Sequence, residues 1–169
     1  GDDHTNVFLG GAGSINTNDG GNDNFDGVDN NVELAGDVWN LVGQPGSFGS
    51  NVTYNGGNDT FFTTNTEQFA RIAGDAWQMD RPGAATVTLN GGRDNIDISG
   101  NTSASSWATG DVNVMNAGTL NGGNDTIAGD ASFSPQIAGD VREYNGGTVN
   151  GGDDIIQAEE AGDIGGDVY

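Results

Sequence analysis

A short motif of glycine, asparagine and aspartate returns five times along the chain and offers the groups that bind hard cations. It stands as Asn-Gly-Gly-Asn-Asp at residues 55–59 and 121–125, with variants at 19–23, 90–94 and 150–154. The first glycines are residues 20, 56, 91, 122 and 151, so the spacings are 36, 35, 31 and 29. Adjacent glycines allow a tight turn that bares backbone carbonyls, and the aspartate adds an anionic oxygen. The motif therefore predicts a repeated cation-binding turn.

A second motif, Gly-Asp, keeps step with the first. We name the aspartates of the Gly-Gly motif the first column and those of the Gly-Asp motif the second column, because a repeat stacks equivalent residues. The first column is Asp23, Asp59, Asp94, Asp125 and Asp154, and the second is Asp37, Asp75, Asp111, Asp140 and Asp167. All ten are predicted metal ligands, together with the backbone of Gly20, Gly21, Gly56, Gly57, Gly91, Gly92, Gly122, Gly123, Gly151 and Gly152.

The chemistry of these ligands favours several calcium ions. Calcium takes about six to eight oxygens, whereas magnesium keeps its waters. Zinc prefers histidine or cysteine, but His4 is the only histidine and cysteine is absent. Stacked aspartates roughly 5 Å apart repel by about 1 kcal/mol per pair even in water. About eight to ten ions, one per aspartate turn, would relieve this repulsion. The alternative is an ordinary Asx turn, in which aspartate bonds its own backbone.

Apolar residues recur at fixed offsets from both motifs and predict the elements that position them. Phe25, Phe61, Ile96, Ile127 and Ile156 each come two residues after a first-column aspartate. No helical apolar period runs far without a glycine, whereas residues 86–89 alternate as a strand does. A strand this short gains ladder hydrogen bonds only by stacking on its copy in the next unit. We therefore predict an all-β fold, a parallel β-solenoid of β-roll or β-helix type, with about five coils of 29–36 residues. Each coil is expected to hold two or three very short strands.

The repeat organises the chain as one domain over residues 1–169. Residues 1–19 resemble a degenerate half coil, and residues 151–169 an incomplete last coil. Residues 44–47 and 81–84 are expected to bulge as surface loops. Trp39 and Trp77 occupy equivalent places and should face away from the core, either as a lateral contact surface or as a second packed layer.

Composition excludes several classes of function. Twenty-five acidic residues against four arginines give a net charge of −21, so no basic patch can neutralise nucleic-acid phosphates. An anionic membrane surface would repel the chain, and no apolar run approaches the roughly 20 residues of a membrane span. No serine–histidine arrangement and no isolated carboxylate pair suggests an enzyme. Only 33% of the residues are hydrophobic, so the metal-free chain could be disordered.

The segment from Gly122 to Ile127, followed by Ala128-Gly129-Asp130, resembles the RTX or haemolysin-type calcium-binding repeat of secreted bacterial proteins. That family's nonapeptide is Gly-Gly-x-Gly-x-Asp-x-Φ-x, where the glycine-rich half binds calcium and Φ lies on a strand. Here the turn is shortened and lacks the third glycine. The resemblance implies that the first-column aspartates are calcium ligands, and the Gly-Asp turn resembles a companion motif. It also implies a secreted bacterial protein, extracellular or at the cell surface.

These features lead to three expectations about function. The first is a structural protein whose solenoid subunits assemble head to tail into extracellular filaments or matrix, because neither end carries an evident cap. The second is a monomeric binding or adhesion module for a glycan at the cell surface, a partner protein or ice. An ice-binding face would need regular ranks of threonine or asparagine, and Thr60, Thr86, Thr88 and Thr126 are irregular in sequence. The third is a secretion or stability segment of a larger protein.

Overall fold

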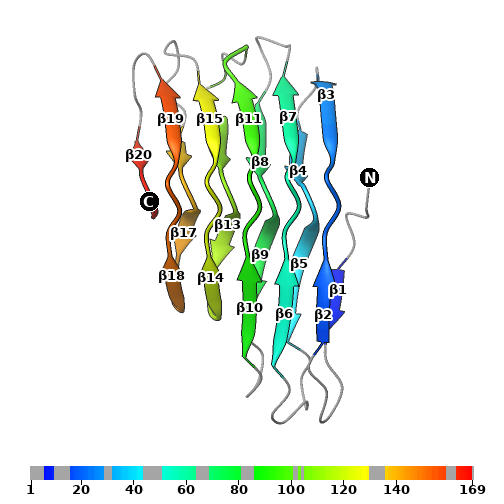
Figure 1. Cartoon of the computed structure of the whole chain (residues 1–169). Coiled ribbons are helices and arrows are strands. Elements are labelled where there is room, and N and C mark those ends of the chain that lie inside the picture. The colour runs from blue at the N-terminus through cyan, green and yellow to red at the C-terminus, as the bar shows by residue number, and fades with distance from the viewer. Residues whose placement is uncertain are drawn as a thin grey trace.

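The chain folds into a parallel β-solenoid, which confirms the predicted fold class (Figure 1). The computed structural model describes residues 6–9, 16–28, 32–43, 51–63, 69–80, 86–100, 103, 105–129, 136–158 and 163–168. Within these ranges there are twenty strands and no helix. Each strand pairs in parallel with the strand four places along the chain, so four stacked sheets of five strands result. The described part of the chain therefore holds no helix long and apolar enough to cross a membrane.

We name the four sheets A to D in the order in which the chain enters them. Sheet A contains β1 (Asn6–Leu9), β5 (Val38–Gly43), β9 (Ala76–Asp80), β13 (Val112–Met115) and β17 (Val141–Tyr144). Sheet B contains β2 (Asn16–Asp19), β6 (Val52–Asn55), β10 (Val87–Asn90), β14 (Thr119–Asn121) and β18 (Thr148–Asn150). Sheet C contains β3 (Asn24–Val28), β7 (Thr60–Thr63), β11 (Asn95–Ile98), β15 (Thr126–Gly129) and β19 (Ile155–Ala158). Sheet D contains β4 (Val32–Ala35), β8 (Ala70–Ala73), β12 (Trp107–Thr109), β16 (Gln136–Ala138) and β20 (Ile164–Gly165).

Each repeat unit thus contributes four strands, and the expectation of two or three was wrong. The strands are only two to six residues long. A strand of three residues contains a single inward side chain, so its alternation cannot be told from a turn in the sequence. Such strands persist because each one shares its backbone hydrogen bonds with the units above and below.

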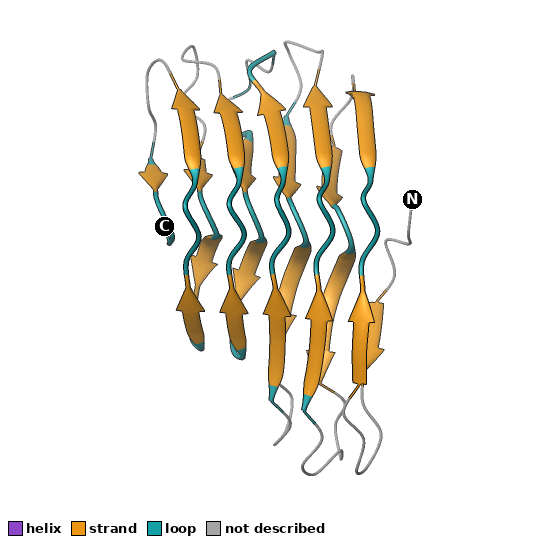
Figure 2. Ribbon diagram, viewed as in Figure 1, coloured by secondary structure: helices purple, strands orange, loops and turns teal. Residues whose placement is uncertain are grey.

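The sheets form a flattened slab with two apolar cores. Sheets B and C form one layer of the slab and sheets A and D the other (Figures 1 and 2). The first core lies between sheets A and B and includes Leu41, Met79 and Leu89. The second lies between sheets C and D and includes Phe61, Ile72 and Ile127. The turns that carry the aspartates lie between these two cores, and we call that level the waist.

The register stacks the predicted apolar residues on one another. Phe61, Ile96, Ile127 and Ile156 are direct partners across sheet C. Phe25 precedes them, and its ring stacks on that of Phe61 with centroids 4.9 Å apart. Burying one such side chain contributes about 1.5–3 kcal/mol, so each column adds to the attraction between coils.

Aromatic side chains form a packed layer on the outside of the waist. Trp39 and Trp77 point away from the core, are half-buried, and stack with ring centroids 4.3 Å apart. Trp107 on sheet D is buried and lies 5.2 Å from Trp77, and the Arg142 guanidinium lies 4.5 Å above the Trp107 ring. Of the two readings of Trp39 and Trp77, these contacts favour the packed layer. The surface loops predicted at residues 44–47 and 81–84 lie outside the described residues.

Candidate metal centre

The two aspartate turns face each other across the waist. The Gly-Gly turn connects sheet B to sheet C and always contains four residues, such as 56–59 between β6 and β7. The Gly-Asp turn connects sheet D back to sheet A and contains two residues, such as 74–75 between β8 and β9. These turns run at mid-height on opposite layers of the slab (Figure 2). The side chains of both columns therefore enter one shared interior space.

Nearly all the predicted ligand carboxylates are buried there. In the first column, Asp59, Asp94 and Asp125 are 1% exposed and Asp23 is 7% exposed. In the second column, Asp37 is 3% exposed, and Asp75, Asp111 and Asp140 have no exposed surface. Asp154 and Asp167, in the last unit, are half-buried and exposed respectively. Buried carboxylates are uncommon unless they are paired or bind a metal, so eight in one space require a physical reason.

Each first-column carboxylate from Asp59 to Asp154 accepts, on one oxygen, a hydrogen bond from the backbone of the preceding unit. The amide N–H of Asp23 donates to Asp59 Oδ1 at 2.6 Å, and that of Asp59 donates to Asp94 Oδ1 at 2.7 Å. The same bond joins Asp94 to Asp125 at 2.8 Å and Asp125 to Asp154 at 2.9 Å. These bonds fix the carboxylates and leave Oδ2 of each directed into the waist.

Second-column carboxylates are held from the opposite layer. The amide N–H of Gly57 donates to Asp37 Oδ2 at 2.6 Å, and that of Gly92 donates to Asp75 Oδ2 at 3.0 Å. Gly152 N–H donates in the same way to Asp140 Oδ1 at 3.1 Å. Each Gly-Gly turn therefore clamps the aspartate that faces it, which orients the remaining oxygen toward the first column.

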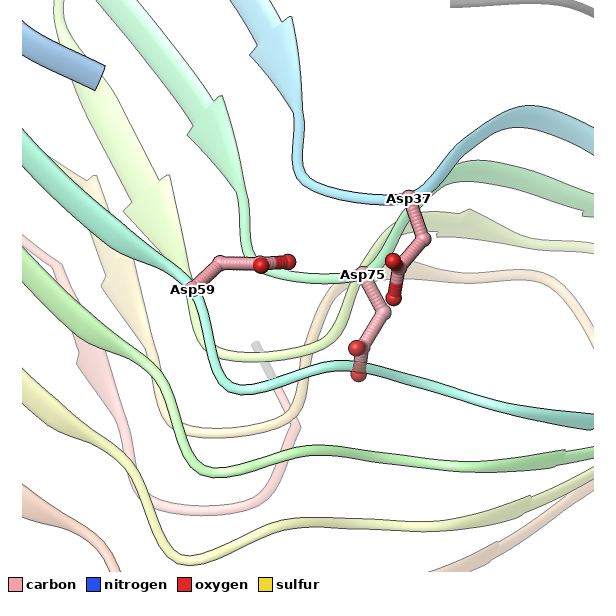
Figure 3. A group of neighbouring side chains, drawn as sticks. All are labelled: Asp37, Asp59 and Asp75. Atoms are coloured by element: carbon pink, nitrogen blue, oxygen red, sulfur yellow. The ribbon is translucent and has the colours of Figure 1, made fainter. Parts of the chain in front are cut away.

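Seven buried carboxylate oxygens in the waist have no hydrogen-bond partner. They are Asp37 Oδ1, Asp59 Oδ2, Asp75 Oδ1, Asp94 Oδ2, Asp125 Oδ2, Asp140 Oδ2 and Asp154 Oδ2. Figure 3 shows Asp59 reaching from one side of the waist toward Asp37 and Asp75 on the other. Leaving a buried charged group unsatisfied is costly, so these oxygens favour the binding of a positively charged partner.

Carboxylate oxygens of the two columns gather in groups of three. Ligand oxygens from Asp37, Asp59 and Asp75 lie within 4.8 Å of one another, and so do those from Asp75, Asp94 and Asp111. A third group joins Asp140, Asp154 and Asp167. Each group takes one aspartate from the first column and two from adjacent coils of the second.

Burial shifts the ionisation of these carboxyls strongly. It raises the pKa of Asp59 to about 7 and that of Asp37 to about 6, from an ordinary value of 3.8. The pKa values of Asp125 and Asp140 rise likewise to about 7 and about 6. For Asp75, Asp94 and Asp111 burial raises the pKa well above 3.8, and repulsion from neighbouring aspartates adds to the effect. The waist is a place where negative charge is unstable without a bound cation.

The glycines of the Gly-Asp turns leave room for converging oxygens. A Cβ at Gly74 would lie 1.9 Å from Asp94 Oδ2 and 1.6 Å from the Gly110 carbonyl oxygen. At Gly110 it would lie 1.9 Å from Asp125 Oδ2 and 2.0 Å from the Gly139 carbonyl oxygen. A carboxylate and a backbone carbonyl thus meet where any other residue would place a side chain. The residues predicted for the site did not include Gly36, Gly74, Gly110 and Gly139, although a glycine directly precedes every second-column aspartate in the sequence.

The first glycine of each Gly-Gly pair leaves room for the second-column carboxylate that faces it, as at Gly56, where a Cβ would lie 1.9 Å from Asp75 Oδ1, and the second glycine allows close approach between coils. A Cβ at Gly92 would lie 1.4 Å from the Gly57 carbonyl oxygen, and one at Gly57 would lie 1.6 Å from that of Gly21. The described glycines with positive φ are Gly118, at 104°, and Gly147, at 117°, and neither belongs to a Gly-Gly-Asn-Asp turn. The turns therefore need glycine for space and not for a left-handed backbone.

An asparagine ladder, also missed, runs beside the waist on sheet B. The Asn90 amide donates to Asn55 Oδ1 at 2.7 Å, Asn121 to Asn90 at 2.7 Å, and Asn150 to Asn121 at 2.8 Å. In the sequence this ladder is visible as the asparagine that directly precedes the Gly-Gly pair in four of the five units. Two residues before each rung the register aligns Thr17, Thr53, Thr88, Thr119 and Thr148 in one column. This threonine column is regular in space; of the irregular set named from the sequence, Thr88 belongs to it, whereas Thr60 and Thr126 lie on sheet C.

This donor set fits a hard divalent cation. The converging atoms are carboxylate and carbonyl oxygens, which are the ligands of calcium, and no sulfur or imidazole group takes part in the three groups. Comparison with models of protein families, with characterised proteins and with solved structures gave no match.

Proposed function

We propose that the chain is a calcium-dependent structural protein whose solenoid is held together by ions in the waist. The seven unpartnered buried carboxylate oxygens carry this proposal. A divalent cation between facing aspartates turns the repulsion between coils into a bridge. Calcium suits the site better than magnesium because it accepts irregular sets of carboxylates and carbonyls and sheds its water more readily.

A calcium requirement also supports the proposal that the protein works outside the cell. Extracellular modules bind calcium with dissociation constants of about 0.1–1 mM, a range that matches extracellular and not cytosolic calcium. The resemblance of residues 122–127 to the repeat of secreted proteins points the same way. The high acidity of the chain, −21 in net charge, favours solubility in such a medium.

Removing calcium at neutral pH should abolish the ordered stack. At a hundredfold excess over its dissociation constant, each bound ion stabilises the fold by about 2.7 kcal/mol. We expect far-UV circular dichroism to show loss of sheet signal in metal-stripped protein and its return with calcium chloride, but not with equal magnesium chloride. Asp94→Asn should raise the calcium needed for folding, whereas the matched exposed change Asp163→Asn should not. Equal sheet signal and melting temperature with and without calcium would refute the proposal.

We further propose that a second copy stacks on the last unit of the solenoid. Three inward-facing residues there are exposed where their partners in the previous unit are buried: Tyr144 is 44% exposed, Ile164 43% and Val168 39%. Their sheets also end in edge strands, whose unpaired backbone groups can receive another strand. The strands at the first edge have the same direction, so β1 to β4 of another copy would continue the stack as a heterologous contact.

Electron microscopy and light scattering across a calcium titration would test this assembly. Filaments or growing oligomers are expected with calcium, and Ile164→Lys should suppress them by placing a charge at the contact. The control is Phe62→Lys, because Phe62 is also exposed, at 41%, but lies on the outer side of β7 in the middle of the stack. A wild-type chain that remains monomeric in saturating calcium would contradict the assembly proposal.

The monomeric outcome would favour the alternative, a calcium-stabilised binding module. The specific observation behind it is the outer face of sheet B, where a threonine column and the asparagine ladder run side by side. Their grid repeats about every 4.8 Å between coils and about every 6.6 Å along a strand. Such a grid suits a regular ligand such as ice or a crystalline glycan.

A further inference from the structure

Two of the three carboxylate groups of the waist share a residue. Asp75 belongs both to the group with Asp37 and Asp59 and to the group with Asp94 and Asp111. Asp111, Asp125 and Asp140 hold the equivalent positions of the repeat: their oxygens do not all lie within 4.8 Å of one another, but Asp125 Oδ2 lies 1.9 Å from the Cβ position of Gly110, as Asp94 Oδ2 does from that of Gly74. Asp111 and Asp140 would then each belong to two groups as well.

The two columns differ in how far their carboxylates reach along the stack, although aspartates of both columns give an oxygen to a backbone amide. A first-column aspartate has committed Oδ1 to the amide of the preceding unit, so only Oδ2 faces the waist. A second-column aspartate instead spans two units. Asp140 Oδ1 lies 1.6 Å from the Cβ position of Gly122, while its Oδ2 lies 2.8 Å from that of Gly151. The two oxygens of one carboxylate thus lie beside consecutive Gly-Gly turns.

Charge balance agrees with this division. Each unit adds one aspartate from each column, and therefore two negative charges, to the waist. One divalent cation per unit neutralises that charge, whereas one ion per aspartate turn would leave an equal excess of positive charge inside the slab. Excess charge of either sign is costly in a buried space.

We propose that the cations occupy the waist as a single file, in which each first-column aspartate from Asp59 to Asp154 holds one ion and each inner second-column aspartate bridges two. This inference rests on the proposed calcium function and refines it. The described residues supply about four such positions, namely the three groups of three and the related set at Asp111, Asp125 and Asp140. The sequence-based expectation of about eight to ten ions is replaced by about half that number.

Counting bound ions in two matched variants tests the file. Asp75→Asn removes a bridging carboxylate, and Asp94→Asn removes one that serves a single ion. Both side chains are buried and belong to the same group, and asparagine keeps an oxygen for the existing amide bond. Equilibrium dialysis against calcium chloride, followed by elemental mass spectrometry, should find about one ion fewer in Asp94→Asn and about two fewer in Asp75→Asn.

The possible outcomes distinguish a failure of the single-file ion arrangement from a failure of the proposed calcium function. Equal losses in the two variants, checked as folded by circular dichroism in saturating calcium, would overturn the bridging role. The wild-type count decides without any variant: about four ions support the file, and about eight to ten overturn it while leaving calcium binding intact. A wild-type chain that binds no calcium and folds equally well without it would instead overturn the proposed function itself.

Discussion

Single aspartates in the waist occupy an environment that opposes their own charge. Asp75 and Asp111 have no exposed surface, and burial raises the pKa of both well above the ordinary value. One oxygen of Asp75 accepts a backbone hydrogen bond, which defines its orientation, and the other has no partner. The fold thus positions these side chains before any ligand arrives, at the expense of its stability in the metal-free state.

A methyl group at Gly74 should damage the waist. It would occupy the place where Asp94 Oδ2 and the Gly110 carbonyl oxygen converge, both less than 2.0 Å from the added Cβ. Overpacking of this kind costs about 1–3 kcal/mol or more, and it also displaces a ligand oxygen. We expect Gly74→Ala to lower the melting temperature in saturating calcium and to weaken calcium binding, as measured by calorimetry.

Gly166→Ala is the control for this change. Gly166 also precedes a second-column aspartate, but a Cβ there would meet nothing within 4 Å. Its φ lies outside the left-handed range, so alanine brings no backbone strain. Equal effects of the two substitutions would show that the loss of glycine's backbone flexibility, and not a lack of space in the waist, explains the lower melting temperature.

At the scale of elements, each strand is too short to be stable alone and gains its partners from the neighbouring units. The backbone ladders run along the stack, the apolar columns run with them, and the asparagine ladder adds side-chain hydrogen bonds in the same direction. Every type of contact therefore reinforces the same register. A slip of one residue would move Ile96 out of the core and break all three at once.

This common register explains why much of the fold could be predicted from the sequence. The spacing of Phe61, Ile96 and Ile127 identified residues that the structure pairs directly. The number of strands could not be obtained in this way, because strands such as β20, with two residues, show no alternation. The asparagines of the ladder recur in the sequence as part of the Asn-Gly-Gly motif, but that motif predicted only a turn and not hydrogen bonds between side chains of neighbouring units.

The two aspartate columns were predictable from the sequence, but their arrangement across the waist was not. Sequence spacing shows which residues stack along the solenoid, such as Asp59 on Asp94. It does not show which turns face each other, because that depends on where the chain reverses between sheets. The groups formed by Asp37, Asp59 and Asp75 combine turns from opposite layers of the slab, so they emerge only in three dimensions.

At the scale of the whole molecule, metal-free protein should be more stable in acid than at neutral pH. The pKa values of Asp59 and Asp125 rise to about 7 and those of Asp37 and Asp140 to about 6, all above the unfolded value of 3.8. The folded state therefore binds more protons than the unfolded state, and this stabilisation is lost as pH rises through about 6–7. Thermal melts of metal-stripped protein should show a cooperative transition at pH 5 that moves to lower temperature or is lost at pH 8.

Two controls isolate the waist as the cause. Melts at high ionic strength screen the repulsion among exposed charges, so a remaining shift reports on buried groups. In saturating calcium the trend should reverse, since protons then compete with the ion for the same oxygens. A metal-stripped protein whose melting temperature stays constant or increases from pH 5 to pH 8 would contradict the prediction.

The constant length of the waist turns has a consequence for how such a chain can vary. The Gly-Gly turns occupy residues 20–23, 56–59, 91–94, 122–125 and 151–154, four in every unit, and the Gly-Asp turns two. Most of the variation in repeat length falls in the segments that join sheet A to sheet B and sheet C to sheet D, such as 44–51 against 145–147. Insertions at these two rims leave the ion path untouched. Evolution or a protein engineer could lengthen these connecting segments, or add whole units, without changing the spacing of the carboxylates along the waist.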